Sequence, residues 1–322
     1  MRHFFVINPH SFRKKKEKLK QVLKDIENCF TDEREYIIYL SRYPRDAVSA
    51  IHRYMTKVPA GQSVRVYAVG GDGILFDCLN GMIDFPNAEL TAVPYGSSND
   101  YVRAFGEKAY EKFQNISQLY SAPSRPVDII NCGINYAING VAFGLESQAV
   151  FNANSVFRLS SLKWLRNFSG LIYKFGGIAA IINKEVRMQK YKVLLDGEDL
   201  SGNYCNISVS NTPCIGGNLM SNPYASPVDG FLDAVFAKSG SILTVMGFFG
   251  DYTSGQYEKN KAFLGRKFKK MEIQSDVPIR AHLDGETFYT EDLKLEIMPG
   301  RIKFFAPQGM DFIDYSYRAY KK

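Results

Sequence analysis

The first third of the chain alternates short apolar runs with longer segments of helical spacing, and this alternation limits the fold more than any other feature. The apolar runs are typical of buried strands and lie at residues 4–7, 36–40, 64–69 and 90–93. In the segment after the first run, Leu19, Val22 and Ile26 fall on one helical face. Pro44 is expected at the first position of the next helix, which runs to about Lys57. A regular strand–helix order predicts an α/β fold with a mostly parallel sheet.

The pattern changes after residues 121–126, a polar stretch with two prolines that suggests a linker. Beyond it extended segments dominate, and helical patterns return only at 156–184 and 241–249. Near the C-terminal end we expect separate strands at 269–274, 279–283, 293–298 and 302–306. A chain of 322 residues is long enough for two domains, at about 150 residues each. We expect an α/β domain over residues 1–125 and a β-rich, sandwich-like domain over 126–302.

Composition excludes several classes of protein. With 45% hydrophobic and 23% charged residues, the chain is globular rather than disordered. No apolar stretch approaches the roughly 20 residues of a membrane-spanning helix. Five scattered cysteines form no CxxC pair, which argues against a disulfide framework or a zinc site and favours a cytoplasmic protein. The formal net charge of +7 permits an anionic partner without choosing among nucleotide, acidic membrane and nucleic acid.

Two loops follow neighbouring predicted strands and precede helices. Gly70-Gly71-Asp72-Gly73 allows the backbone to turn tightly and to approach a ligand, and the next helix directs its N–H groups and positive dipole end there. Pro94-Tyr95-Gly96-Ser97-Ser98-Asn99-Asp100 follows the next strand, where a serine can cap a helix or bind a phosphate oxygen. The first loop alone is equally consistent with a turn that binds nothing, and the second loop alone would more often be only a helix N-cap. Because ligands of doubly wound sheets bind at the carboxyl ends of the strands, the pair predicts a nucleotide site.

Five motifs, taken in order, resemble those of the diacylglycerol kinase catalytic domain family, which includes soluble bacterial lipid kinases, sphingosine kinases and ceramide kinases. They are NPHS at 8–11, GGDGILFDCLNGM at 70–82, PYGSSNDYVRAFG at 94–106, NPYASPVDGFLD at 222–233 and HLDGE at 282–286. The resemblance implies an ATP-dependent lipid kinase, with ATP bound by the first domain. It also implies a cleft between the domains and a final segment, 303–322, that packs back on the first domain.

The resemblance further implies which residues contact the nucleotide. They are Asn8, Pro9, His10, Ser11, Ser41, Gly70, Gly71, Asp72, Gly73, Ile74, Gly96, Ser97, Asn99 and Asp100. Asp72 is also a candidate for contact with the magnesium of the nucleotide. The chain departs from the family pattern at Phe12, Ile74 and Phe76, where the family has glycine, threonine and asparagine. These departures affect the expected nucleotide contacts but leave the acidic residues in place.

The resemblance places the catalytic base in the segment Asp284-Gly285-Glu286. If the strand continues through Gly285, the two carboxylates point to the same face. One can then take the proton of the attacking hydroxyl while the other orients it or holds magnesium. We expect Glu286 to be the base, with Asp284 essential beside it, although the roles could be reversed. The alternative is an ordinary hairpin turn, as we expect for the second copy of the tripeptide at 196–198.

A bound Mg²⁺ is likewise implied by the resemblance, in the segment PVDGFLD. Its ligands would be the Asp229 carboxylate and the backbone carbonyls of Ser226 and Phe231. Oxygen ligands of this kind suit magnesium. The alternative is a structural Asp-Gly turn.

Two features suggest contact with a lipid surface. Basic residues cluster at 13–16 and 266–270, and an aromatic, apolar insertion at 157–182 contains Trp164, Phe168 and Tyr173. Solvated helix or strand faces and core packing are the alternatives. We expect a lipid substrate met at the membrane surface by peripheral association, no nucleic acid partner, and leave a homodimer open.

The leading hypothesis is therefore a kinase that phosphorylates a lipid hydroxyl, with diacylglycerol as the first candidate acceptor. Two alternatives stay open. The first is a kinase of a soluble substrate, because GGDG loops also occur in NAD kinases. The second is a catalytically impaired lipid- or nucleotide-binding protein, suggested by Phe12, Ile74 and Phe76.

Overall fold

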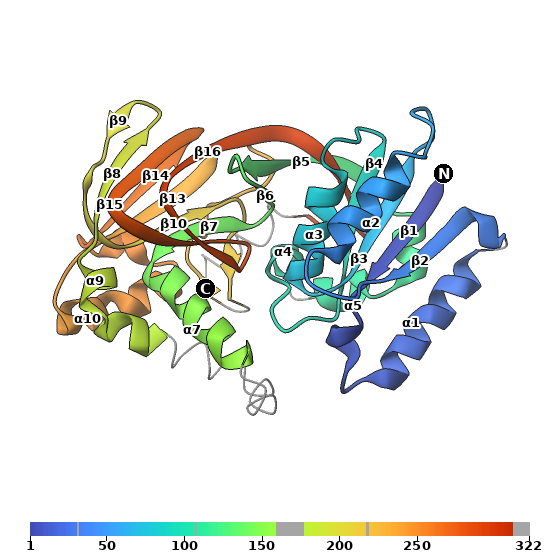
Figure 1. Ribbon diagram of the computed structural model, residues 1–322, viewed down its shortest axis with the longest axis horizontal. Helices are drawn as coiled ribbons and strands as arrows, with labels where there is room; N and C mark the ends of the chain where they lie inside the picture. The colour runs from blue at the N-terminus through green and yellow to red at the C-terminus, as the bar shows by residue number, and fades with distance from the viewer. Residues whose placement is uncertain (31, 107, 159–176, 217–218, 312–322) are drawn as a thin grey trace.

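The computed structural model describes residues 1–30, 32–106, 108–158, 177–216 and 219–311. Figure 1 shows two domains side by side, with the N-terminal α/β domain on the right and a β-rich domain on the left. Strands β5 (Ser124–Asn131) and β16 (Glu286–Phe305) run between them. In the part of the chain that the structure describes, no helix is both long and apolar enough to cross a bilayer.

Four strands form the sheet of the N-terminal domain in the order β2-β1-β3-β4, and every neighbouring pair is parallel. They are β1 (Arg2–Ile7), β2 (Tyr36–Leu40), β3 (Val64–Gly70) and β4 (Ala88–Pro94). Every residue of β3 is buried, because a parallel sheet is covered on both faces. This explains why the strand has a continuous apolar character rather than an alternating one.

The helices of this domain pack in two groups, α2 on α3 and α1 on α6. Their bounds are α1 (Lys16–Cys29), α2 (Asp46–Met55), α3 (Asp72–Met82), α4 (Asp100–Arg103), α5 (Ala109–Phe113) and α6 (Ile116–Tyr120), with 3₁₀ turns η1 (Pro9–Phe12) and η2 (Glu33–Glu35). The expected start of α2 at Pro44 is wrong. Arg45 adopts a left-handed conformation (φ 68°), so the helix begins only at Asp46.

The C-terminal domain is built mainly from antiparallel strands around its own apolar core. Besides β5 and β16 these are β6 (Tyr136–Ala137), β7 (Gly140–Gly144), β8 (Lys190–Leu195), β9 (Glu198–Asp199), β10 (Gly202–Ser210), β11 (Cys214–Ile215), β12 (Leu219–Met220), β13 (Leu232–Lys238), β14 (Phe263–Phe268) and β15 (Lys270–Leu283). The main order is β14-β13-β10-β7-β15-β16. The domain is therefore β-rich.

Helices cover one part of this domain: α7 (Leu145–Arg158), α9 (Lys184–Arg187) and α10 (Ile242–Thr253), with a 3₁₀ turn η4 (Tyr257–Lys259). Residues 177–182 are also helical. The helix expected to begin at 156 begins earlier, at Leu145, directly after β7. The aromatic residues Trp164, Phe168 and Tyr173 of the expected insertion lie outside the described residues.

Two long strands replace the four short ones expected near the C-terminal end. β15 joins the segments 269–274, except for the first residue, and 279–283 through a shift in its register with β16. β16 has 20 residues and includes both 293–298 and 302–306 except for the last residue. Its register with β5 shifts between Met298 and Ile302, so the strand continues through an irregularity rather than ending.

β16 carries the chain from one domain to the other. Its residues Lys303 and Phe304 pair in parallel with Glu89 and Leu90 of β4. Phe304 and Phe305 are buried in the core of the N-terminal domain. The strands of both domains consequently belong to one hydrogen-bonded network, and this limits how freely the domains can move apart.

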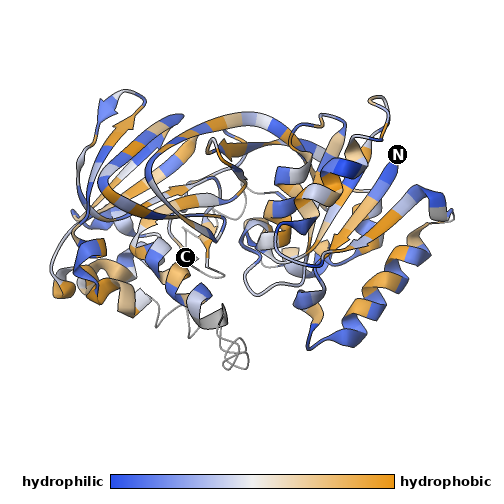
Figure 2. Ribbon diagram, in the orientation of Figure 1, coloured by the Kyte–Doolittle hydropathy of each residue, from blue (hydrophilic) through white to orange (hydrophobic). Residues whose placement is uncertain are grey.

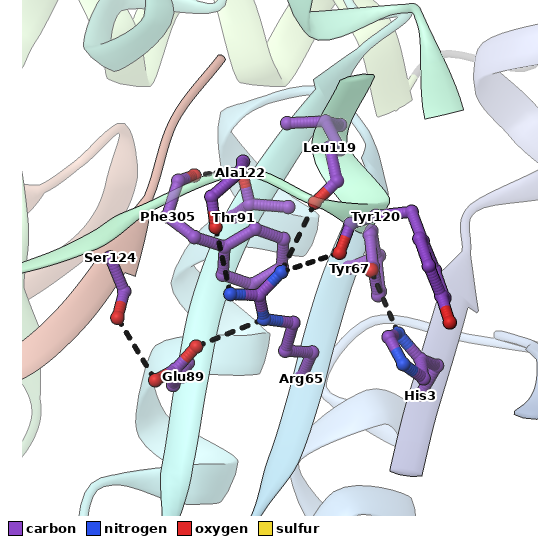
Figure 3. Close-up of polar contacts among 10 residues, drawn as sticks. All are labelled: His3, Arg65, Tyr67, Glu89, Thr91, Leu119, Tyr120, Ala122, Ser124 and Phe305. Carbon is purple, nitrogen blue, oxygen red and sulfur yellow. Dashed lines mark hydrogen bonds and ion pairs between the residues drawn. The ribbon is translucent and has the colours of Figure 1, made fainter. Parts of the chain in front are cut away.

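A buried arginine stabilises this junction (Figure 3). Arg65 of β3 donates to Glu89 Oε2 (3.0 Å) and to the carbonyls of Leu119, Tyr120 and Ala122 at the end of α6. Its guanidinium lies 4.7 Å from the centre of the Phe305 ring. Arg65 can make these contacts because its planar head has five N–H donors in a fixed arrangement.

Candidate functional site

Three loops meet at the carboxyl ends of β1, β3 and β4. The Gly70 carbonyl accepts hydrogen bonds from Tyr95 N (2.6 Å) and Gly96 N (2.9 Å). A Cβ on Gly70 would lie only 3.1 Å from Ser11 Oγ and 3.2 Å from Asn8 Cβ. Ser41 joins the same edge through its N–H bond to the Ile7 carbonyl (2.9 Å). The structure thus brings together the three loops that the sequence assigns to nucleotide binding.

The closest approach is between Gly71 and Gly96. A Cβ on Gly96 would lie 2.3 Å from the Cα of Gly71, a separation that real Cβ atoms do not show. Neither backbone can move away without breaking the hydrogen bonds to Gly70. Glycine is therefore required at position 96 by the contact between the loops.

We expect Gly96→Ala to destabilise the protein by about 1–3 kcal/mol, the usual cost of overpacking, and to weaken nucleotide binding because the loops separate. Thermal unfolding and nucleotide titration would measure the two effects. Gly61→Ala is the matched control, since nothing lies within 4 Å of a Cβ there. Equal stability and affinity of the two variants would contradict the proposed loop contact.

Asp72 joins two of these loops with its side chain. Its carboxylate accepts hydrogen bonds from the backbone N–H groups of Asn99 and Asp100, each at 2.8 Å. Burial raises the pKa of Asp72, while the two N–H groups act in the opposite direction. Both oxygens are thus engaged within the protein, so the observed role of this side chain is to position the loops.

The first turn of α3 is the part of this site best suited to an anion. Its N-cap residue, Gly71, has no side chain to bond the first N–H groups of the helix. Gly73 and Ser97 are exposed at the same edge. Ile74, in contrast, is buried against Gly70, and its backbone N–H already donates to the Gly71 carbonyl (3.2 Å). The helix N-terminus provides N–H groups and a positive dipole end for a phosphate.

Asp284 and Gly285 form a tight turn between β15 and β16, which corrects the expectation of a continuous strand. Both residues have left-handed φ angles, 49° and 92°, and Leu283 pairs directly with Glu286. This is the geometry of a two-residue hairpin, for which Asp-Gly is a preferred sequence. The two carboxylates therefore do not share one face of a strand, and their environments differ.

The Asp284 carboxylate is held by the backbone of the segment before β7. It accepts hydrogen bonds from the N–H groups of Ile138 (2.8 Å), Asn139 (2.9 Å) and Gly140 (2.8 Å). Burial raises the pKa of Asp284 to about 6, although the three N–H groups lower it. With its oxygens engaged in this way, Asp284 fixes the turn on the C-terminal domain.

Glu286 is exposed and lies against the first turn of α3. A Cβ on Gly73 would be 3.6 Å from Glu286 Oε1. The C-terminal domain thus places a carboxylate, with no hydrogen bond or ion pair to any described residue, at the helix N-terminus of the N-terminal domain. A carboxylate in this position can accept a proton from a hydroxyl group that approaches a phosphate on the loops.

Sequence reasoning missed Arg45, which belongs to the same region. Arg45 donates from its backbone N (3.1 Å) and Nη1 (3.3 Å) to Asp77, and from Nη2 to Asn135. Burial raises the pKa of Asp77 to about 6; Arg45 opposes this shift and the charge of Glu286 adds to it. The sequence signal is weak, because only the left-handed turn at Arg45 directs its side chain towards α3.

His282, to which the sequence assigned no role, supports the Asp284–Gly285 turn. Its Nδ1 accepts a hydrogen bond from Gly285 N (3.3 Å), and its Nε2 lies 3.4 Å from Glu146 Oε1. Tyr252 donates to the other oxygen of Glu146 (2.6 Å). Burial disfavours ionisation of Glu146, but the bonds from His282 and Tyr252 lower its pKa overall.

Asp229, in the segment that the resemblance assigns to magnesium, is paired with a cation of the chain itself. Asp229 Oδ1 accepts from Phe231 N (3.0 Å), and Oδ2 lies 2.6 Å from Lys267 Nζ. Within the described residues, no group of three or more His, Cys, Asp or Glu side chains could hold a metal ion. As arranged, Asp229, Ser226 and Phe231 do not fit a resident divalent ion, because the carboxylate is already paired with an ammonium group.

Glycine-rich loops on a parallel sheet, faced by a carboxylate from a β-rich domain, are the arrangement expected of a two-domain kinase. The model of the diacylglycerol kinase catalytic domain matches residues 2–132. The model of the YegS C-terminal NAD kinase beta sandwich-like domain matches residues 140–306. The chain belongs to the family of lipid kinases that joins these two domains.

Known proteins of this kind are similar along most of their length. A Shewanella frigidimarina protein named "Probable lipid kinase YegS-like" is 26% identical over 269 residues, which are 79% of this chain and 80% of that protein. "Putative lipid kinase YtlR" of Bacillus subtilis is 23% identical over 317 residues, 93% and 98% of the two chains. The "Crystal structure of a putative diacylglycerol kinase" from Bacillus anthracis superposes with a TM-score of 0.73 at 20% identity, covering 95% of this chain and 97% of that one. The last comparison establishes similarity of fold alone.

Proposed function

We propose that the protein transfers the γ-phosphate of ATP to a hydroxyl group of a lipid such as diacylglycerol. The observation that carries this proposal is the position of Glu286, whose exposed carboxylate lies beside Gly73. ATP would enter as its magnesium complex, so the metal arrives with the substrate. Phosphoryl transfer requires mainly positioning and charge stabilisation, and both are available here.

Each element of the site has a part in this reaction. The N–H groups at the start of α3 bind phosphate oxygens, and Asp72 keeps the loop at 96–100 beside them. Glu286 accepts the proton of the attacking hydroxyl as the oxygen approaches the γ-phosphate. Asp284 acts as a positioning residue, because its three backbone hydrogen bonds hold the turn that carries Glu286.

The proposal is tested with γ-labelled ATP, magnesium and mixed micelles. The micelles carry diacylglycerol, monoacylglycerol, ceramide, sphingosine or phosphatidylglycerol. We expect label in at least one lipid and none when the micelles lack lipid acceptors. Nucleotide binding with no labelled lipid in the whole panel would contradict the proposal and favour a binding protein.

A soluble acceptor is the second candidate. The C-terminal family model is itself described as similar to the NAD kinase β-sandwich, which is the observation that favours it. NAD belongs in a parallel assay under the same conditions. Label in NAD and in no lipid would replace the first proposal by this one.

We also propose that the acceptor is met at a membrane surface. Figure 2 shows apolar residues along α10 at the outer end of the C-terminal domain, and Leu243 and Met246 are 81% and 59% exposed. Residues 239–250 contain no charged side chain, and Lys238 precedes them. Such an exposed apolar face suits contact with a lipid bilayer.

The double variant Leu243→Ser/Met246→Ser should bind anionic vesicles several-fold less than the wild type in co-sedimentation. Its activity on dispersed, short-chain lipid should be unchanged, because α10 lies outside the phosphate loops. Val277→Ser, at another exposed apolar position, is the control. If the double variant binds vesicles as well as the wild type does, α10 is not the surface that contacts the membrane.

A further inference from the structure

The segment that the resemblance assigns to magnesium ends at the start of β13, where its Asp229 carboxylate contacts Lys267 of β14. The Lys267 Nζ is 2.6 Å from Asp229 Oδ2 and 3.5 Å from Asp233 Oδ2. Asp229 lies in the turn before β13, Asp233 is on β13, and Lys267 is the direct partner of Asp233 on β14. The register of two strands thus determines where this ammonium group lies.

We propose that the Lys267 ammonium serves as the resident cation of this segment, in place of the divalent metal that the resemblance implies. The ammonium group donates a hydrogen bond to Asp229 and forms a longer ion pair with Asp233, whose Oδ2 has no hydrogen bond among the described residues. The Asp233 side chain is only 10% exposed, so its charge needs a partner inside the protein. Lys267 supplies that partner without a metal.

The surroundings of Asp229 also disfavour a divalent ion. Its other oxygen, Oδ1, accepts a hydrogen bond from Phe231 N (3.0 Å). Phe231 thus directs its N–H group towards this carboxylate. Lys269 adds a second positive charge, 4.9 Å from the centre of the Phe231 ring. A magnesium ion needs oxygen ligands at about 2.0–2.1 Å, and an ion bound to the Asp229 carboxylate would lie close to the Lys267 ammonium group.

The turn itself is stabilised by a second contact that needs no metal. Asp128 of β5 accepts hydrogen bonds from Gly230 N and Gly300 N, each at 2.7 Å. One carboxylate therefore fixes both the Asp229–Gly230 turn and the irregular part of β16. Lys267 and Asp128 together stabilise the conformation of this segment, and neither contact needs a metal ion.

The test uses nucleotide-free protein, so its outcome is independent of kinase activity. Binding of Mg²⁺, Mn²⁺ and Ca²⁺ is measured by calorimetry and by thermal shift at constant ionic strength. We expect no saturable binding by the wild type at millimolar metal. Lys267→Met should unfold at a lower temperature without metal, because two carboxylates lose their partner, and should regain stability with saturable metal binding.

Lys269→Met is the matched control, since it removes the same charge nearby without freeing a carboxylate, and it should not bind metal. If Lys267→Met does not fold, Lys267→Gln can replace it in the same metal-binding measurements. The double variant Lys267→Met/Asp229→Asn should lose the acquired metal binding. Saturable binding by the wild type that Asp229→Asn removes would overturn the proposal. So would Lys267 variants that respond to metal no more than the wild type.

Discussion

Replacement of Glu286 by glutamine should lower kcat by about 10²–10⁴-fold, the usual contribution of a general base, while the protein stays folded. The side chain is exposed and carries no fold-stabilising contact in the described structure, so we expect unfolding to change by no more than about 0.5 kcal/mol. Glutamine keeps the size of the side chain but cannot take up a proton. The measurement is steady-state kinetics on the lipid that accepts label, together with thermal unfolding.

The chain supplies a matched control for this variant. Glu198 occupies the same position in the second Asp-Gly-Glu turn, where it lies 3.4 Å from Arg266 Nη2 and far in sequence from the phosphate loops. Glu198→Gln should have wild-type kcat. Full activity of Glu286→Gln would show that another group takes the proton, and would remove the central argument for the proposed mechanism.

Replacement of Asp284 by alanine should destabilise the protein by about 3–5 kcal/mol. Three backbone N–H groups, at 138–140, lose a charged acceptor, and each buried donor left without a partner costs about 1–3 kcal/mol. Activity should fall as well, because Glu286 is carried by the same turn. Asp284→Asn should be intermediate, since the amide keeps one accepting oxygen.

Asp196→Ala is the control for this second prediction. Asp196 has the same left-handed φ of 49° and accepts bonds from Lys269 N and Lys270 N, but it is exposed to solvent. We expect about 1 kcal/mol of destabilisation there, because water can replace the lost acceptor. If chemical denaturation shows equal losses for the two alanine variants, burial does not distinguish the turns and the positioning role is wrong.

The pKa of Asp284 adds a pH dependence with a definite sign. Its folded value of about 6 lies above the value of roughly 3.9 for an unfolded aspartate, so the native state binds the proton more tightly. Stability contributed by this group is therefore greatest below about pH 4 and declines as the pH rises to about 6. The stability difference between wild type and Asp284→Ala should decline over that range and stay constant above it.

Much of the N-terminal domain could be predicted from local sequence. The apolar runs at 4–7, 36–40, 64–69 and 90–93 all became strands. In β1, β3 and β4 the continuous apolar run matches burial on both faces of the sheet, whereas β2, at the edge, is only partly buried. The start of α2 was misplaced, since nothing in the sequence shows that Arg45 turns into a left-handed conformation. The long strands β15 and β16 were divided into shorter ones because their irregular parts look like ordinary turns.

The sequence alone determined the two-domain order, the strand–helix alternation and the glycines of the phosphate loops, since these depend on local periodicity and backbone freedom. It could not separate Asp284 from Glu286. Asp284 is distinguished by its hydrogen bonds to backbone N–H groups about 145 positions away in the sequence. Glu286 is distinguished by its position beside Gly73 of the other domain. It also could not pair Lys267 with Asp233, because strand register decides that contact. Contacts between distant segments assign the roles of charged groups, and only the tertiary structure brings those segments together.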